Sequence, residues 1–260
     1  MIIFDRVEMA YPDGSRALDG VSLRIPRGQF CVILGPSGAG KSTLLRTVNG
    51  LAAPTGGRTL VDGVEVSART LPRLRPRIGM IHQQFNLALR ASVAANVISG
   101  ALPAVSTWRA LAGFFPPRLR RRACELTEAV GLAPEHLRRR VNALSGGQQQ
   151  RVGIARAFML EPDVVLADEP VASLDPRTSR DVLELLRAQS RASGATVLCS
   201  LHQIDLARAF ADRIVALRNG GVAFDGAPDA LDPAALARIY GVATGPAPAP
   251  EGAARLEAAR

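Results

Sequence analysis

The chain has 260 residues, of which 47% are hydrophobic and 4% aromatic, and its 32 basic and 23 acidic side chains give a net charge of +9. This length can bury one sizeable core, or one core with an inserted subdomain. The excess charge is arginine scattered along the chain, so a general arginine bias, helped by an anionic membrane surface, explains it better than a nucleic-acid site. So few aromatic residues offer no stacking platform for bases, and we expect no nucleic-acid partner.

The sequence predicts a protein that stays on one side of the membrane. The short apolar run 1–4 is followed at once by Asp5, so no signal peptide is visible, and no apolar run approaches 18 residues. We therefore expect a cytosolic chain whose membrane role depends on a partner.

In chain order, the first predicted elements are antiparallel hairpins, because Asp13-Gly14 and Asp62-Gly63 are typical hairpin turns. Four short apolar runs without alternation follow, and such runs suit parallel strands that are buried on both faces. These runs are Phe30–Leu34, Val164–Ala167, Thr196–Cys199 and Ile214–Leu217. The stretches that separate them read as helices, namely Ser42–Asn49, Thr178–Ser193 and Asp205–Ala211. The order of strands and helices predicts an α/β fold.

A change in composition predicts an insertion into this core. Residues 88–152 are rich in Ala, Leu and Arg, lack strand signals and read as helical, with breaks at Pro103 and Pro116-Pro117. We therefore expect one discontinuous core domain, residues 1–87 and 153–242, with an inserted helical subdomain at 88–152. Residues 243–260 are Ala/Pro/Gly-rich and are expected to form a flexible tail.

The only lysine of the chain, Lys41, lies in Gly35-Pro-Ser-Gly-Ala-Gly-Lys-Ser42, between a predicted strand and a predicted helix. This pattern and context predict a phosphate-binding loop, in which backbone N–H groups and a compact ammonium meet the β- and γ-phosphates. The alternative, a Gly-rich turn before a helix, does not explain the retained lysine. The candidate nucleotide-binding residues are Gly35, Pro36, Ser37, Gly38, Ala39, Gly40, Lys41, Ser42 and Thr43, and Ser42 is also a candidate Mg²⁺ ligand.

A second candidate is the apolar run 164–167, which ends in Asp168 and Glu169. Parallel strands present ligand sites at their carboxyl ends, so both acids are expected to face the phosphates. Asp168 is predicted to hold Mg²⁺, and Glu169 to orient and deprotonate the attacking water. Alone, such a strand end is a weak signal, but the phosphate loop strengthens it.

A third motif, Leu144-Ser-Gly-Gly-Gln148, stands at the start of a predicted helix, 149–160. With the two motifs above, it resembles the signature of the ATP-binding subunits of ABC transporters, over residues 2–240. The resemblance implies an ABC-type P-loop ATPase core with a mixed sheet, and a head-to-tail dimer with two ATP molecules between the subunits. It also implies that Ser145, Gly146, Gly147 and Gln148 bind the γ-phosphate of ATP on the other subunit. An ordinary N-capped helix is the alternative, and it leaves the paired glycines unexplained.

Further positions match the family one by one. The resemblance implies that Tyr11 stacks under adenine, although a strand residue at the solvent edge is the alternative. It also implies that Gln83 senses the γ-phosphate and Mg²⁺, although Gln84 is next to it, and that His202 touches the γ-phosphate. Residues 173–175 match a segment that lies across the dimer interface.

Within the family, the chain most resembles the ATP-binding subunit of the phosphonate importer. The resemblance rests on residues 83–97, 167–176 and 200–206. It implies an ATP- and Mg²⁺-dependent translocase at the cytoplasmic face of the inner membrane, with membrane permease subunits and a substrate-binding protein as partners. Two alternatives are an accessory cytosolic ABC ATPase of phosphonate breakdown and, less favoured, an ABC ATPase that acts on nucleic acid.

Overall fold

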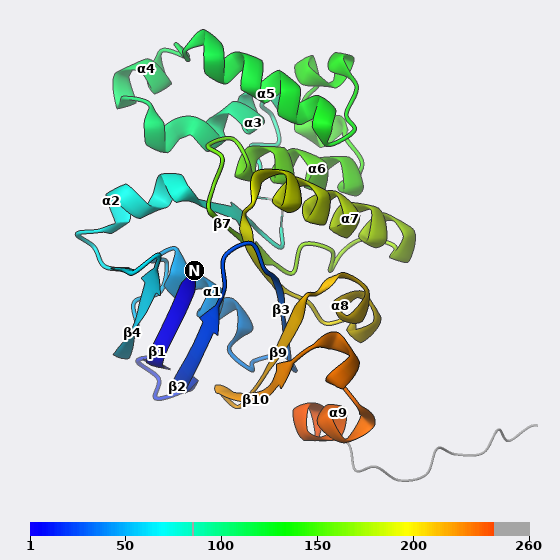
Figure 1. Ribbon diagram of the computed structural model, residues 1–260. Helices are drawn as coiled ribbons and strands as arrows, with labels where there is room; N and C mark the ends of the chain where they lie inside the picture. Colours follow the sequence, from blue (N-terminus) through cyan, green and yellow to red (C-terminus); the bar gives the residue numbers. More distant parts are fainter. Residues whose placement is uncertain (85, 242–260) are drawn as a thin grey trace, which may run out of the picture.

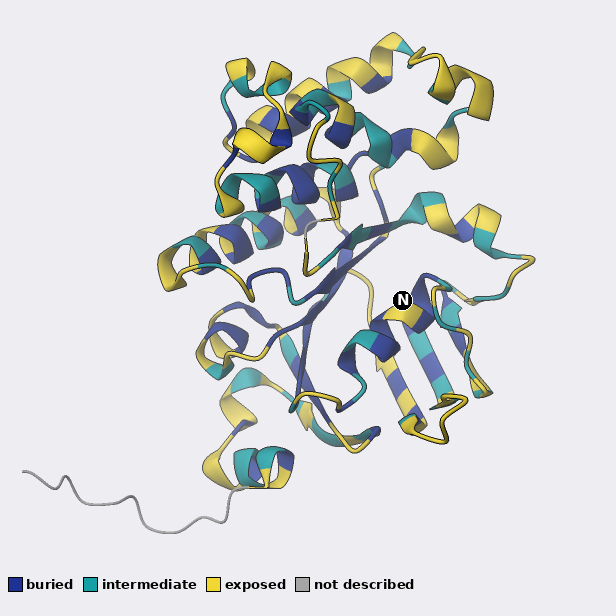
Figure 2. Cartoon of the chain, turned by 180° about the vertical axis from the view of Figure 1, so that it is seen from behind, coloured by how far each residue is buried: buried dark blue, intermediate teal, exposed yellow. Residues whose placement is uncertain are grey.

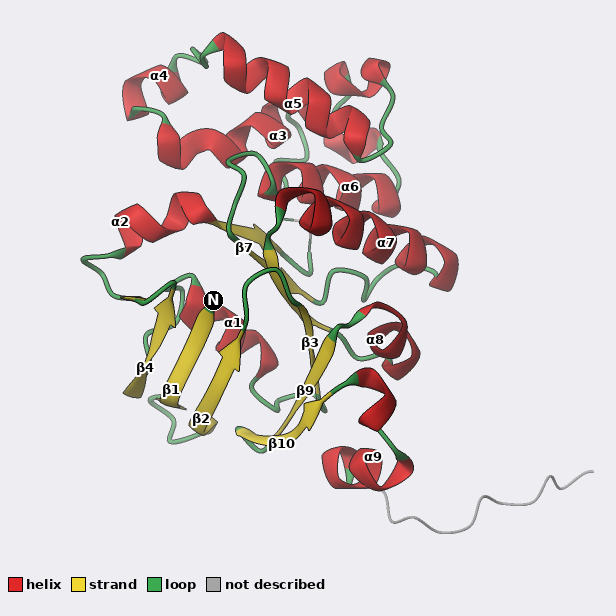
Figure 3. Cartoon of the chain, in the orientation of Figure 1, coloured by secondary structure: helices red, strands yellow, loops and turns green. Residues whose placement is uncertain are grey.

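The computed structural model describes residues 1–84 and 86–241, so the tail predicted at 243–260 lies outside the described residues. Two sheets and a layer of helices make up the protein (Figures 1 and 3). The strands are β1 (Ile2–Ala10), β2 (Arg16–Ile25), β3 (Phe30–Leu34), β4 (Gly56–Val61), β5 (Val64–Glu65), β6 (Ile78–Ile81), β7 (Val164–Asp168), β8 (Thr196–Ser200), β9 (Arg213–Arg218) and β10 (Gly221–Gly226). The α-helices are α1 (Lys41–Val48), α2 (Leu71–Leu74), α3 (Val93–Ile98), α4 (Thr107–Leu111), α5 (Pro117–Ala129), α6 (Gly146–Ala157), α7 (Pro176–Ser193), α8 (Ile204–Phe210) and α9 (Pro233–Tyr240). Short 3₁₀ turns are η1 (Arg75–Arg77), η2 (Ser99–Ala104), η3 (Pro134–Arg138), η4 (Val141–Ala143) and η5 (Pro228–Ala230).

The larger sheet has the strand order β10-β9-β3-β8-β7-β6 and is parallel except for β10. The four predicted buried strands are its central neighbours, β9, β3, β8 and β7, which confirms the predicted α/β fold. The reason for the unalternated apolar runs is visible in β3. Val32 packs against the helices on one face of the sheet, and Ile33 packs against α1 and the smaller sheet on the other face. Both faces of each strand therefore exclude water.

The smaller sheet is antiparallel, with the order β2-β1-β4-β5. Its two predicted turns are confirmed, since Asp13-Gly14 lies between β1 and β2 and Asp62-Gly63 between β4 and β5. Leu44 and Leu45 of α1 belong to the same buried cluster as Ile2 and Phe4 of β1. Helix α1 therefore lies between the two sheets, and this placement fixes the loop that precedes it.

Helices α3 to α6 follow β6 and precede β7, and they form the upper layer of Figure 1. The prolines act as the sequence predicts: Pro103 lies within the 3₁₀ turn η2, and Pro117 is the first residue of α5. The division of the chain at 87/88 and 152/153 stays a prediction, and α6 continues across the second boundary. No helix in the described ranges is both long and apolar enough to cross a membrane.

Candidate functional site

The phosphate loop leaves the buried strand β3 at Leu34 and enters α1 at Lys41. The Lys41 side chain folds back under the loop, where its Nζ donates to the carbonyl oxygens of Gly35 (2.9 Å) and Pro36 (3.0 Å). Burial lowers the pKa of Lys41, and the nearby carboxylates of Glu169 and Asp168 partly oppose this shift. A compact ammonium fits this position, which explains why one lysine persists in a chain that otherwise uses arginine.

Two glycines of the loop are required by space as well as by backbone conformation. Gly35 has φ +141° and Gly40 has φ +100°. A Cβ atom would lie 2.3 Å from the carbonyl oxygen of Leu217 at the first position and 2.2 Å from that of Ala17 at the second. Both glycines therefore allow the loop to approach its neighbours closely.

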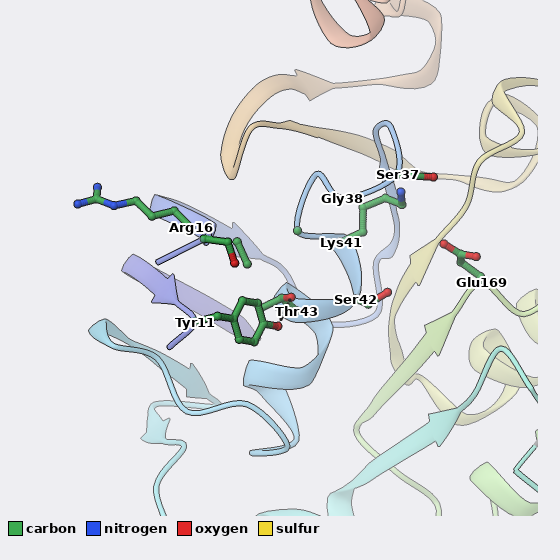
Figure 4. Close-up of a pocket in the computed structure, with 11 residues that line it drawn as sticks. Tyr11, Arg16, Ser37, Gly38, Lys41, Ser42, Thr43 and Glu169 are labelled. Carbon is green, nitrogen blue, oxygen red and sulfur yellow. Dashed lines mark hydrogen bonds between the residues drawn. The ribbon is translucent and has the colours of Figure 1, made fainter. Parts of the chain in front are cut away.

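A cavity of about 340 Å³ opens over this loop (Figure 4). It is lined by Tyr11, Ser15, Arg16, Ala17, Ser37, Gly38, Gly40, Lys41, Ser42, Thr43 and Glu169. Tyr11 lies at its outer end, with its hydroxyl 3.1 Å from Oγ1 of Thr43, so the ring is held beside the start of α1. Stacking of adenine on Tyr11 stays a prediction. The sequence does not predict Arg16 as a cavity residue, because a lone arginine at the start of a strand gives no signal.

The carboxylate of Asp168 ends β7 beside the phosphate loop. Its Oδ1 accepts hydrogen bonds from Ser42 Oγ (2.8 Å) and from Ser200 Oγ (3.0 Å), and the residue is 5% exposed. A hydroxyl oxygen and a buried carboxylate at hydrogen-bonding distance are the oxygen donors that Mg²⁺ prefers. The chemistry of this donor set fits the predicted metal.

Glu169 follows directly, and the structure brings it together with the two other predicted catalytic residues. Its Oε2 accepts a hydrogen bond from Gln83 Nε2 at 2.9 Å, and its Oε1 lies 2.5 Å from His202 Nε2. Of the two glutamines, Gln83 and not Gln84 makes this contact. The backbone of Glu169 is in the left-handed region at φ +47°, a conformation that costs energy in a non-glycine residue and is typical of functional sites. This turn directs the carboxylate toward the cavity (Figure 4).

Ser200 is a second site residue that the sequence does not predict. Its hydroxyl joins the two acids, because it donates to Asp168 and accepts the backbone N–H of Glu169 at 2.9 Å. The register of the larger sheet places Ser200 in the site, because Ser200 of β8 is paired with Asp168 of β7. A serine at a strand end does not reveal this pairing.

The signature motif does not line the cavity. Ser145 is instead the N-cap of α6 in a capping box with Gln148: its Oγ accepts from Gln148 N at 3.3 Å, and Gln148 Oε1 accepts from Ser145 N at 3.0 Å. A Cβ atom at Gly147 would lie 2.6 Å from Cγ2 of Thr178 in α7, so this glycine has a packing reason within the chain. Within the chain, Ser145 also accepts the Gln149 N–H with its backbone carbonyl oxygen, at 2.9 Å. Binding of the γ-phosphate of a second subunit's ATP by this motif stays a prediction.

Known proteins are similar to this chain along most of its length. Phosphonates import ATP-binding protein PhnC from Hydrogenovibrio crunogenus is 54% identical over 240 residues, which cover 92% of this chain and 88% of that protein. The protein of the same name from Hyphomonas neptunium is 47% identical and covers 89% of this chain and 88% of its own length.

Solved structures agree. The dimeric, post-hydrolysis ATP-binding cassette MJ0796 with ADP and Pi has a TM-score of 0.75 and 34% identity, covering 88% of this chain and 99% of its own. The cbiO1 protein from Clostridium perfringens, part of the ABC transporter complex cbiONQ, has a TM-score of 0.77 and 31% identity, with 88% of both chains covered.

Residues 18–172 match the ABC transporter family over more than half of the chain. With a phosphate loop, two strand-end acids and relatives this similar along most of its length, the chain belongs to the ABC transporter family as an ATP-binding, ATP-hydrolysing subunit.

Proposed function

We propose that this chain drives the import of phosphonate across the cytoplasmic membrane, as the ATP-hydrolysing subunit of an ABC importer. The observation that carries this proposal is the 54% identity, over 92% of the chain, to a phosphonates import ATP-binding protein. The geometry also supports the proposal. Ser42 of the phosphate loop donates to Asp168, and Glu169, which lines the cavity, contacts Gln83 and His202.

The residues suggest a division of labour. The loop amides and Lys41 bind the phosphates, and Ser42, Asp168 and Gln83 would hold Mg²⁺, which neutralises charge on the β- and γ-phosphates. Glu169 accepts a proton from the attacking water. The Glu169 carboxylate contacts Gln83 and His202, which places both side chains next to the proposed base. Both would contact the γ-phosphate of bound ATP.

The site is proposed to be completed by a second copy of the chain. Ser145, Gly146, Gly147 and Gln148 of one subunit would reach the γ-phosphate in the cavity of the other. Closure would depend on that phosphate, so hydrolysis reopens the dimer. Permease subunits would receive this motion, a substrate-binding protein would deliver phosphonate, and the chain would lie peripherally on the cytoplasmic face of the membrane.

The test is growth of a strain that lacks this chain on 2-aminoethylphosphonate as the only phosphorus source. We expect growth to be lost, to be restored by the intact chain, and not to be restored by Glu169→Gln. The purified Glu169→Gln chain should bind ATP, form a trapped ATP-bound dimer and lose about 10²- to 10⁴-fold in turnover, because the general base is gone.

Glu184→Gln, which changes an exposed glutamate of α7, is the matched control and should behave as wild type. Unchanged growth of the deletion strain, with no second importer present, would refute phosphonate as the cargo. Loss of growth that persists when phosphonate enters by another route would point to breakdown rather than uptake. Wild-type turnover by Glu169→Gln would show that the base is misassigned.

A further inference from the structure

Three large apolar side chains stand out from the surface at the outer end of the helical layer. Trp108 is 83% exposed, Leu111 76% and Phe114 67%, and we call these three residues the Trp108 patch. They belong to α4 and the turn after it, and α4 has no buried residue (Figures 1 and 2). Apolar side chains gathered in this way on a surface typically mark an interaction site.

The patch is held in place by the chain that follows it. Phe115 packs against the main core cluster, and its carbonyl oxygen accepts a hydrogen bond from Arg120 Nε at 3.0 Å. Leu119 of α5 is buried in the same cluster. Because Phe115 and α5 are anchored, Phe114 is directed outward by a fixed backbone.

The stretch of sequence that contains the patch carries positive charge only. Residues 66–124 contain ten arginines and no acidic residue, whereas the rest of the chain has 22 basic and 23 acidic residues. The arginines are scattered along the sequence, as composition suggested, but the acids are not, so the net positive charge of the chain is confined to this stretch. Arg109, Arg118 and Arg121 are exposed beside the patch, and in the described ranges no ion pair involves them.

These observations indicate what kind of surface would bind to the Trp108 patch. Tryptophan and phenylalanine flanked by arginines are typical of surfaces that lie in the headgroup region of a bilayer, where the rings enter the acyl boundary and the guanidinium groups meet anionic phosphates. A protein partner would have to match Arg109, Arg118 and Arg121 with acids of its own. An anionic lipid surface supplies that complementary charge without a dedicated pocket.

We propose that the Trp108 patch, with Arg109, Arg118 and Arg121, binds directly to the surface of a membrane that contains anionic lipid. The chain would thus contact the bilayer itself in addition to the permease. This inference rests on the proposed membrane location but is independent of which ligand is transported.

Trp108 is the only tryptophan of the chain, so its fluorescence reports on this surface alone. The full-length protein is mixed with vesicles of phosphatidylcholine, or of phosphatidylcholine with phosphatidylglycerol. We expect a blue shift of the emission, and quenching by brominated acyl chains, only with the anionic vesicles. High salt should weaken the binding about tenfold or more, because it screens the arginines.

Two double variants separate the charge from the apolar contact, and both keep Trp108. Arg118→Gln with Arg121→Gln, and Leu111→Ser with Phe114→Ser, should each reduce vesicle binding about tenfold. The matched controls are Arg191→Gln on α7 and Leu51→Ser, an exposed leucine of similar accessibility (61%), and both should bind as wild type. ATP hydrolysis by all four proteins should be unchanged, which shows that they fold.

The proposal is wrong if anionic vesicles leave the emission of Trp108 unchanged, or if the control variants lose as much binding as the patch variants. A shift that occurs only in vesicles carrying the permease would assign the patch to a protein partner and would also refute it. None of these three results bears on the proposed import, which is judged by growth on phosphonate and by ATP turnover.

Discussion

The two acids of the site depend on one hydroxyl, that of Ser200. It is fully buried, donates to Asp168 Oδ1 at 3.0 Å and accepts the backbone N–H of Glu169 at 2.9 Å. In Ser200→Ala the Glu169 N–H loses its acceptor and the strained turn at Glu169 is less well fixed, at a cost of about 1–3 kcal/mol. We expect kcat for ATP hydrolysis to fall about tenfold in steady-state assays, with a smaller change in KM.

Ser190→Ala is a matched control, because Ser190 is also buried (4% exposed) and its Oγ donates to the carbonyl oxygen of Arg187 in α7. Both variants lose a buried hydrogen bond, so both should lower the melting temperature, but only Ser200→Ala should lower kcat. Equal kcat in the two variants would show that Ser200 is merely structural.

At the scale of residues, the sequence predicts the site residues that belong to a local motif. Lys41, Asp168 and Glu169 each stand in such a motif, and the structure places all three at one edge of the parallel sheet. Ser200 and Arg16 could not be predicted, because their positions depend on which strands are neighbours rather than on adjacent residues.

At the scale of elements, Asp62 joins the two sheets. Asp62 follows β4 of the smaller sheet, and its carboxylate accepts hydrogen bonds from Arg27 Nε (2.8 Å) and Arg77 Nη2 (2.6 Å). Arg77 lies in η1, just before β6 of the larger sheet. Its Nε also donates to Asp163 (2.6 Å), just before β7. Burial alone would raise the pKa of Asp62, but the hydrogen bonds from Arg27 and the amino group of Met1 outweigh it and lower the pKa to about 2.

A depressed carboxyl pKa stabilises the fold above the ordinary value of 3.8, and this stabilisation is lost as the pH falls toward 2. We therefore expect Asp62→Asn to lower the free energy of unfolding by about 1–2 kcal/mol at pH 7. The effect is less than the full pKa shift implies, because Arg27 and Arg77 are exposed and solvent screens their charges. Asparagine tolerates the left-handed φ of +50° at this position, so the change isolates the charge.

Urea unfolding of Asp62→Asn and wild type, repeated from pH 7 to pH 3, measures this difference, which should shrink as the pH falls. Asp229→Asn, an exposed aspartate of η5, is the control and should show no difference at any pH. A gap that stays constant with pH would mean that the ion pairs of Asp62 do not explain its effect.

The elements that the sequence does not predict share a physical reason. Strands β6 and β10 are the two edges of the larger sheet. In β6 only Gly79 and Ile81 are buried and the glycine interrupts the large apolar residues, and in β10 no residue is buried. Strand β7, by contrast, is buried along its whole length and is obvious from the sequence. Burial on both faces, and not propensity, is what makes a strand predictable here.

At the scale of the whole molecule, each chain is proposed to supply half of each of two sites. The cavity contains Lys41, whereas Ser145 caps α6 and does not line the cavity. If the subunits pair head to tail, a chain with Lys41→Ala and a chain with Ser145→Arg complement each other. The mixed dimer then has one ruined site, which carries both changes, and one intact site, which carries neither.

We expect each variant alone to hydrolyse ATP far more slowly than wild type, and an equal mixture to recover up to about a quarter of the wild-type rate. Random pairing makes half of the dimers mixed, and each mixed dimer keeps one of its two sites. Differently tagged chains, captured in sequence, verify that mixed dimers form. Suppose that mixed dimers form, remain inactive, and bind no more ATP than dimers of either variant alone. Each chain must then complete its own site. The packing of Gly147 against Thr178 and the capping box of Ser145 would then be the full reason for the signature motif.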